Sequence, residues 1–537
     1  MNRYVVGIDT GGTNTDSVLL ENNSVIDKHK IPSKNTLKSI EKSLKKLLVQ
    51  NSINGEKLDR VVLATTRILN KVKQNRTPKT ISILISGPGL DPEYACYAEF
   101  NENIQGTIDH RGRKTEEIDY SELKEIKDRY KNLPCIAISC KFSIRNPEIE
   151  KKVSKAFDSD KITSMAHEVN GKLNYLTRSS MTVLNVKSKK IHNKLLKRID
   201  KVKQNLDIKA PFYFTKSDGG LLNKELTQRN PINLIKSGPV MSAYGLLSLT
   251  KQRNAITIDI GGTTTDISYI EKKGPKLEKN LKVSNYKTSL RSVDSIDLPY
   301  GGDSAIKIKS NKIDLLKERK DDSAAFGGKY PTLTDALNSL GITEKGNTQR
   351  SKRKIRSHVR DTKFEEKDAA KTVLNRYIKE LKTKIKEFTK ERDTVENPPL
   401  LGAGALSNSI IPKLASELNK KYQVPEHAEI AGAIGCAVIQ PSIQVKLHLD
   451  TDRKKLTING EKKEINFNKK FDLNQAKDLA IDQVKTKAKK ITKSSDIDKT
   501  PKIADERYFN VVKNGRVKGK IYDITAKLEP RIERYLN

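Results

Sequence analysis

The 537-residue sequence has no tryptophan, only four cysteines and no long hydrophobic segment. The cysteines form no Cys-x-x-Cys pair and no metal-binding spacing, which argues against a disulfide framework or a zinc ribbon and favours reduced thiols. No apolar run approaches the length that spans a bilayer, and an extended segment begins at Tyr4 without a leader in front of it. We therefore expect a cytoplasmic protein with no membrane partner.

Aromatic residues are also scarce, at 5% of the chain, although the formal net charge is +37. Proteins that bind single-stranded nucleic acid usually combine a basic groove with interleaved aromatic side chains, and this sequence has no such pattern. Its lysines are spread along nearly the whole chain, as on a solvated surface. We expect salt-sensitive attraction to polyanions but no specific nucleic-acid partner.

One short motif occurs twice. Residues 6–18 read VGIDTGGTNTDSV, and residues 257–268 read TIDIGGTTTDIS. In each copy an apolar run contains an Asp, and Gly-Gly-Thr separates it from a second apolar run, which predicts a β-hairpin with a glycine-rich turn. Paired glycines let backbone N–H groups approach an anion closely. A single copy is often only a turn, whereas two matched copies favour phosphate binding.

The repeat assigns matched roles to two sets of residues. Asp9 and Asp259 end the first strand of each hairpin, where a carboxylate holds Mg²⁺ through its waters. A third loop, Gly402-Ala403-Gly404, joins an apolar strand to a helix and is a candidate for adenosine binding. The predicted nucleotide-binding residues are Gly11, Gly12, Thr13, Thr15, Gly261, Gly262, Thr263, Thr265, Gly402 and Gly404. The order of two phosphate loops and an adenosine loop resembles the actin-like ATPase superfamily.

A second set of polar residues lies mostly between the hairpins. Asp109, His110 and Arg113 share one turn, and His167 stands beside Glu168. Such a set is able to bind a divalent metal or polarise a carbonyl, although no His-x-x-x-His spacing supports this. For each histidine alone, a structural role is about as well supported. Asp303, in a Gly-rich turn, adds a loop carboxylate.

A longer series of short motifs resembles the hydantoinase A / 5-oxoprolinase family, which includes ATP-using subunits of N-methylhydantoinase and of acetone-type carboxylases. Ile149 departs from this pattern, because the family often has a His there, as does the turn 86–90, where the family usually has Gly-Phe-Arg/Glu-Asp. Besides the hairpins and the 402–404 loop, the series comprises Ala64–Thr66, Ile108–Arg113, Asn146–Glu150, His167–Val169, Arg178–Asn185, Ser217–Gly220, Ser237–Pro239, Gly301–Ser304, Gly327–Ala336 and Ala431–Ala437.

The resemblance implies an α/β fold of two actin-like, ribonuclease H-like halves around a central ATP cleft, with a small C-terminal α+β segment. It implies ATP and Mg²⁺ as cofactors, a small cyclic amide or carbonyl compound as substrate, and an oligomer with a possible separate B subunit. The residues that this assigns to catalysis are Asp9, Asp259, His110, His167 and Glu168. Those that it assigns to substrate contact are Asp109, Arg113 and Asp303.

The same fold leaves three functions open: an ATP-dependent hydrolase of cyclic amides, a small-molecule kinase or carboxylase ATPase subunit, and a non-enzymatic nucleotide-switched scaffold. Length and pattern predict three domains, with residues 1–180, 181–440 and 441–537. We also expect a basic helix over 183–204 and a mobile loop over 344–363, which is rich in Gly, Ser and Arg and poor in apolar residues.

Overall fold

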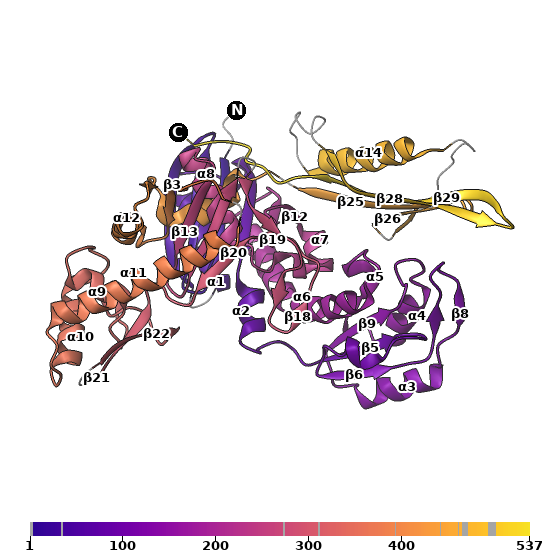
Figure 1. The fold of residues 1–537 in the computed structure, drawn as a ribbon, viewed down its shortest axis with the longest axis horizontal. Coiled ribbons are helices and arrows are strands. Elements are labelled where there is room, and N and C mark those ends of the chain that lie inside the picture. The colour runs from indigo at the N-terminus through magenta and orange to yellow at the C-terminus, as the bar shows by residue number, and fades with distance from the viewer. Residues whose placement is uncertain are drawn as a thin grey trace.

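The computed structural model confirms an α/β fold of two related halves, with an inserted domain and a C-terminal α+β domain (Figure 1). None of the helices described is long and apolar enough to cross a membrane. The residues that the structure describes are 4–33, 36–271, 274–309, 312–392, 394–440, 442–459, 461–463, 471–491 and 501–536.

The first half is built on a mixed sheet in the order β12-β11-β4-β1-β2-β3. The predicted hairpin is β1 and β2, with Asp9 opposite Asp16, and β4 lies parallel to β1 on its other side. Helix α1 covers this sheet because Ile40, Leu44 and Leu47 fall on one buried face. The elements are β1 (Tyr4–Thr10), β2 (Asn14–Glu21), β3 (Ser24–Pro32), α1 (Thr36–Gln50), β4 (Leu58–Thr65), α2 (Arg67–Lys73), α6 (Tyr175–Asn205), β11 (Phe212–Thr215), β12 (Leu221–Asn223) and α7 (Lys224–Arg229).

The second half repeats this plan. Its sheet has the order β15-β14-β13-β23-β24, with β20 also paired to β14. The second hairpin is β13 and β14, with Asp259 opposite Asp266, and β23 lies parallel to β13 as β4 does to β1. The elements are α8 (Gly238–Thr250), β13 (Ala255–Ile260), β14 (Thr265–Glu271), β15 (Gly274–Pro275), β20 (Ser295–Leu298), β21 (Ser304–Lys309), β22 (Lys312–Arg319), α9 (Leu333–Ser339), α10 (Thr348–Val359), α11 (Glu366–Lys390), β23 (Leu400–Ala403), α12 (Ser407–Leu418), β24 (Tyr422–Gln423) and α13 (Ala431–Val438).

A separate domain is inserted between α2 and α6 and lies at the lower right of Figure 1. Its sheet is all parallel, in the order β10-β9-β5-β6. Both faces of this sheet are covered, as a parallel sheet requires. The elements are β5 (Thr80–Ile85), β6 (Phe100–Asn103), β7 (Thr107–Ile108), β8 (Lys114–Glu116), α3 (Tyr120–Arg129), β9 (Cys135–Cys140), α4 (Glu148–Ala156), β10 (Ile162–Met165) and α5 (Ala166–Val169).

The C-terminal domain is a five-stranded antiparallel sheet, β27-β26-β25-β29-β28, with α14 on one face (Figure 1). Its elements are β25 (Ile443–Asp450), β26 (Lys455–Ile458), β27 (Glu461–Lys463), α14 (Leu473–Ile491), β28 (Lys502–Lys513) and β29 (Arg516–Leu528). Two short ladders precede β20: β16 (Leu277–Glu278) with β19 (Ser292–Val293), and β17 (Lys282–Val283) with β18 (Tyr286–Lys287).

The two halves touch through α8 and α13, which approach each other backbone to backbone. A Cβ added at Gly245 would lie 1.9 Å from the carbonyl oxygen of Ala431, and one added at Gly435 would lie 1.9 Å from that of Met241. Only glycine fits at these two positions. Although α13 is the last element of the second half in sequence, it packs on the first sheet, where a Cβ at Gly7 would meet Ala433.

Two expectations from the sequence need correction. The predicted loop at 344–363 contains α10, because Ser351, Ile355 and Val359 are spaced four apart and bury one helix face. The predicted helix at 183–204 begins earlier, at Tyr175, where the side chain of Asn174 caps it. A boundary between residues 180 and 181 therefore falls inside α6.

Candidate nucleotide site

The two glycine-rich turns meet at the centre of the molecule. The hydroxyl oxygens of Thr13 and Thr263 lie 3.4 Å apart, although 250 residues separate them in sequence. A Cβ added at Gly262 would lie 2.7 Å from the Thr13 hydroxyl. The structure thus brings the predicted phosphate loops of both halves face to face.

Asp9 carries a carboxylate oxygen that the protein leaves unsatisfied. Its Oδ1 is buried and accepts no hydrogen bond from the residues that the structure describes. On the other side, Oδ2 would lie only 2.3 Å from a Cβ added at Gly432 of α13. Burial, and then repulsion by Asp16 and Asp259, raise the pKa of Asp9 to about 7.

Asp259 occupies the matching position in the second hairpin but has a partner. The hydroxyl of Ser242, on α8, donates to Oδ2 of Asp259 at 2.5 Å. Burial raises the pKa of Asp259, and the Ser242 hydrogen bond acts against this rise. Burial and the neighbouring Asp259 also raise the pKa of Asp266 to about 7.

These carboxylates suit a hard cation that keeps part of its water shell. Within the described ranges, no group of three or more His, Cys, Asp or Glu side chains is placed to hold a metal ion by itself. Mg²⁺ is usually held by one or two carboxylates together with water and phosphate oxygens. The unsatisfied oxygen of Asp9 and the oriented carboxylate of Asp259 fit that pattern.

Two of the predicted phosphate ligands face the protein interior instead. The Thr15 hydroxyl bonds with those of Ser33 and Ser39, at 2.8 and 2.7 Å. The Thr265 hydroxyl donates to the carbonyl of Tyr300 and bonds with the Tyr377 hydroxyl. Both threonines are buried, whereas Thr13 and Thr263 are partly exposed.

The third loop lies against the second hairpin. Gly404 has φ +90°, and a Cβ there would lie 2.2 Å from the carbonyl oxygen of Ile260. A Cβ at Gly402 would lie 2.7 Å from the side chain of Ile411. Packing by the protein itself therefore explains both glycines, while the contact with Ile260 places the loop where a nucleotide bound to this hairpin would reach it.

Asp303 also supports the second hairpin, away from the other predicted substrate residues. Its backbone N–H donates to the carbonyl of Gly262 at 2.7 Å. Its carboxylate accepts a hydrogen bond from Ser323 at 2.7 Å and lies 3.2 Å from Nε of Arg319. These contacts hold the turn in place, and Oδ2 of Asp303 would lie 2.7 Å from a Cβ added at Gly262.

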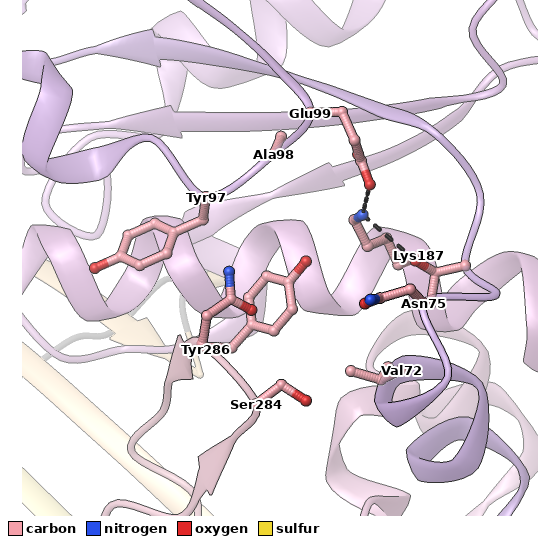
Figure 2. A pocket seen from close by; sticks show the side chains of 10 residues that line it. Val72, Asn75, Tyr97, Ala98, Glu99, Lys187, Ser284 and Tyr286 are labelled. Atoms are coloured by element: carbon pink, nitrogen blue, oxygen red, sulfur yellow. Dashed lines mark hydrogen bonds and ion pairs between the residues drawn. The ribbon is translucent and has the colours of Figure 1, made fainter.

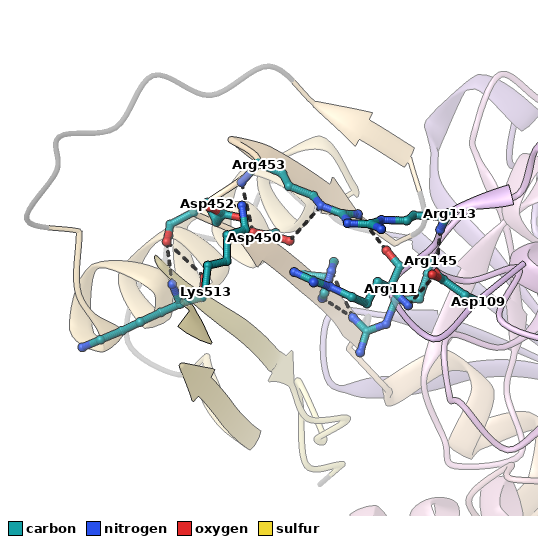
Figure 3. Close-up of polar contacts among 11 residues, drawn as sticks. Asp109, Arg111, Arg113, Arg145, Asp450, Asp452, Arg453 and Lys513 are labelled. Carbon is teal, nitrogen blue, oxygen red and sulfur yellow. Dashed lines mark hydrogen bonds and ion pairs between the residues drawn. The ribbon is translucent and has the colours of Figure 1, made fainter. Parts of the chain in front are cut away.

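The polar turn with Asp109, His110 and Arg113 joins β7 to β8 and faces the C-terminal domain (Figure 3). Oδ1 of Asp109 accepts hydrogen bonds from the backbone N–H groups of Arg111 and Arg113, at 2.9 and 2.8 Å. The guanidinium of Arg453 donates to the carbonyl of Arg111 at 2.8 Å. This turn therefore ties the inserted domain to the C-terminal sheet.

His167 lies in a different, buried network. Its Nδ1 is 2.5 Å from Oε2 of Glu150, and its backbone N–H donates to the same oxygen. Oε1 of Glu150 accepts from the N–H of Cys140, and the Glu168 carbonyl accepts from Asn230. Among the described contacts, none joins this network to the turn of Asp109, so the structure does not gather the predicted polar set at one place.

A cavity of about 250 Å³ lies where the inserted domain meets α2 and the turn between β17 and β18 (Figure 2). At its wall, the ammonium of Lys187 pairs with Glu99, and only 3% of the Lys187 side chain is exposed. Asn75, Asn285 and Tyr286 add polar groups to the lining. Helix α2 contacts both places: Val72 lines this cavity, and Asn70 lies against Gly12 of the first hairpin.

Two family descriptions match the sequence: the hydantoinase/oxoprolinase N-terminal region over residues 5–159, and hydantoinase/oxoprolinase over residues 178–444. The chain belongs to the hydantoinase/oxoprolinase family. It is 24% identical over 476 residues to the alpha subunit of caprolactamase from Pseudomonas jessenii, covering 78% of this chain and 68% of that protein. An uncharacterised protein of Methanocaldococcus jannaschii is 25% identical over 387 residues, which is 63% of this chain and 56% of that protein.

Two solved structures share the fold of this hydantoinase/oxoprolinase chain. Nucleotide-free acetone carboxylase, from an ATP-dependent carboxylation system, aligns with a TM-score of 0.75 at 16% identity, covering 99% of this chain and 89% of that one. The ATP-dependent caprolactamase of P. jessenii aligns with a TM-score of 0.69 at 20% identity, covering 99% and 88%.

Sequence reasoning assigned no site role to three residues that shape the site. Ser242 and Gly432 flank the two aspartates, and Glu150 organises the network around His167. The small residues of α13 were a usable signal for close packing, but nothing local in the sequence marked Ser242 as the neighbour of Asp259 or Gly432 as the equivalent neighbour of Asp9.

Proposed function

We propose that this protein is an ATP-dependent hydrolase that opens a small cyclic amide after phosphorylating its oxygen. The meeting of the two hairpins carries this proposal, because the hydroxyls of Thr13 and Thr263 lie 3.4 Å apart and the two glycine-rich turns could therefore contact the same polyphosphate. The membership of the hydantoinase/oxoprolinase family and the relationship to caprolactamase support it.

In this proposal, the backbone and hydroxyls of the turns at 11–13 and 261–263 hold the phosphates. Asp9 and Asp259 hold Mg²⁺, which supplies positive charge against the phosphate oxygens. The amide oxygen attacks the γ-phosphorus and ADP leaves. Water then adds to the activated carbon, the C–N bond breaks, and phosphate is released. Catalysis rests on positioning and charge neutralisation rather than on a covalent protein nucleophile.

We place the cyclic amide in the cavity beside α2. Side-chain amides such as those of Asn75 and Asn285 offer a donor and an acceptor together, which match the N–H and C=O of a lactam or hydantoin ring. Val72 of α2 lines this cavity, and Asn70 of the same helix lies against Gly12 in the first phosphate turn. His110, His167 and Glu168, which the sequence assigned to catalysis, are not among the residues that line this cavity.

The decisive experiment measures ATP hydrolysis with hydantoin, 5-oxoproline, caprolactam, and acetone with bicarbonate. Each is tested with and without a candidate second subunit, because the relative from P. jessenii is named as a subunit alpha. We expect strong stimulation by one cyclic amide, with ring-opened product in step with ADP. A stable phosphorylated product would show a kinase, stimulation by acetone and bicarbonate would show a carboxylase ATPase, and nucleotide binding without turnover would show a scaffold.

The position of the substrate is tested separately with Asn75→Leu. We expect KM for the cyclic amide to rise about tenfold, as when a buried hydrogen bond to the ligand is lost, with little change in the affinity for ATP. An unchanged KM would show that the substrate does not bind in this cavity, but it would not contradict the proposed hydrolase activity.

A further inference from the structure

The inserted domain has the topology of a ligand-binding α/β sheet. Numbered within the domain, its strand order β6-β5-β9-β10 is 2-1-3-4, and all four strands are parallel. The chain leaves β5 toward β6 on one side and returns to place β9 on the other. In open parallel sheets, ligands bind at the carboxyl ends of the strands where the order reverses, which here is between β5 and β9.

A cavity of about 290 Å³ lies at that point. Its walls are the segments that follow β5, β6 and β9, and its lining is mostly apolar, with Ile85, Ile108 and Phe142 among the side chains. The cavity beside α2 is instead lined by Thr77 and Glu99, which precede β5 and β6. The two cavities therefore lie at opposite ends of one sheet, and the one at the carboxyl ends is separate from the proposed cyclic-amide site.

The wall of this cavity holds a strained residue. Phe142 has φ +63°, a left-handed conformation that bulky residues rarely adopt. Hydrogen bonds from the backbone N–H groups of Arg145 and Asn146 to its carbonyl hold it there. Strain of this kind persists where the surrounding structure enforces it, most often at ligand sites.

Lys141 is one of the residues that line the cavity. Its ammonium donates to the carbonyl of Pro88 at 2.8 Å and lies 5.8 Å from the ring centroid of Phe142. In the part of the chain that the structure describes, Lys141 forms no ion pair. The one carboxylate in the lining, Asp109, is engaged by two N–H groups of its own turn. Lys141 thus lines a mostly apolar cavity without an ion-pair partner among the described residues, and Oδ1 of Asp109 is already hydrogen-bonded within its own turn.

We propose that this cavity binds a small organic carboxylate with a compact apolar body, and that Lys141 is its anchor. The ammonium turns from the neutral carbonyl of Pro88 to the ligand carboxylate, which gives a charge-assisted hydrogen bond in place of a neutral one. The apolar body displaces water from the walls formed by Ile85 and Phe142. This site is independent of the nucleotide site and of the proposed hydrolase activity.

The test compares hexanoate with its neutral counterpart hexanamide by calorimetry on the full chain without nucleotide. We expect saturable binding of hexanoate, with at least tenfold weaker binding of hexanamide. In protein labelled at isoleucine methyl groups, the signals of Ile85 and Ile108 should shift on titration. If butanoate, hexanoate, octanoate and benzoate all fail to bind up to 10 mM, roughly the millimolar limit of weak specific recognition, the proposal is overturned.

Two variants separate binding from folding. Lys141→Met keeps the length of the side chain and should weaken the binding of hexanoate at least tenfold. Lys124→Met, on the exposed face of α3, should leave this binding unchanged. Phe142→Gly removes a wall but accepts φ +63° without strain, so it should fold and lose most of the affinity. Equal hexanoate affinity in wild type and Lys141→Met would contradict the proposed anchor even if binding itself is real.

Discussion

The two phosphate hairpins have nearly the same sequence and the same strand register, yet their aspartates have different neighbours. The reciprocal contacts of Gly245 and Gly435 make α8 and α13 equivalent, and three residues earlier on each helix stands the neighbour of an aspartate. On α8 this is Ser242, which donates to Asp259, and on α13 it is Gly432, which only makes room for Asp9.

This difference shows that two copies of one sequence motif are able to place the same carboxylate in different surroundings. The protein orients the carboxylate of Asp259 through a hydroxyl, whereas it leaves an oxygen of Asp9 without a partner. Leaving a buried carboxylate oxygen unsatisfied has a cost, which a bound cation relieves. The fold therefore orients the carboxylate of Asp259, whereas in the proposed site a bound cation would orient that of Asp9.

The largest expected effect comes from removing either charge. Asp9→Asn and Asp259→Asn should each lower substrate-stimulated ATP hydrolysis on the order of 10²- to 10³-fold, as the loss of one electrostatic contact in a preorganised site does. Circular dichroism should show an unchanged fold. Asp160→Asn, on the exposed surface, serves as the control. Full activity in either variant would remove its aspartate from the proposed metal site.

The second prediction concerns the glycine contacts between α8 and α13, which are equivalent in the two halves. Gly245→Ala and Gly435→Ala each force a Cβ against a carbonyl oxygen, so each should destabilise the protein by about 1–3 kcal/mol in denaturant unfolding, as overpacking does. Gly238→Ala is the matched control, because its Cβ would meet Thr66 at an ordinary 3.6 Å. Clearly unequal losses at residues 245 and 435 would break the equivalence of α8 and α13.

The third prediction isolates the hydroxyl that distinguishes the halves. Ser242→Ala should raise the Mg²⁺ concentration needed for half-maximal activity by roughly tenfold, since residues that orient a metal ligand have effects of this size. Ser248→Ala, which removes a buried hydroxyl further along α8, should leave the Mg²⁺ requirement unchanged. The absence of any change in Ser242→Ala would mean that the fold does not need this hydroxyl to place Asp259.

The smallest expected effect is a change in how steeply Tm depends on pH. Burial raises the pKa of Asp9 to about 7 from 3.8, so the folded protein holds this proton more tightly than the unfolded chain. The resulting stabilisation is present below pH 4 and is lost as the pH rises to about 7. Without Mg²⁺, Tm of the wild type should therefore fall more steeply between pH 5 and pH 7 than Tm of Asp9→Asn. Saturating Mg²⁺ should flatten the wild-type slope.

The sequence predicts the hairpins, the α/β halves and the family correctly, because glycine pairs and apolar runs report on local backbone geometry. Prediction from the sequence fails where contacts between residues far apart in the chain determine the structure. The segment 344–363 is poor in apolar residues, but three small or apolar side chains suffice to dock α10. Thr15 looks like a phosphate ligand until its hydroxyl is seen bonded to Ser33 and Ser39. The roles of Asp303 and Glu150 also depend on partners far away in sequence.

The glycine contact between α8 and α13 also defines how the halves are able to move. Beside the crossing, Val240 and Met241 of α8 pack in one buried cluster with Val62 and Ala64 of β4, so rotation at this point would disturb those contacts. Sliding along either helix would also drive the side chains that flank Gly245 and Gly435 into the opposite backbone. The crossing thus resists both movements, which keeps the hydroxyls of Thr13 and Thr263 within 3.4 Å of each other.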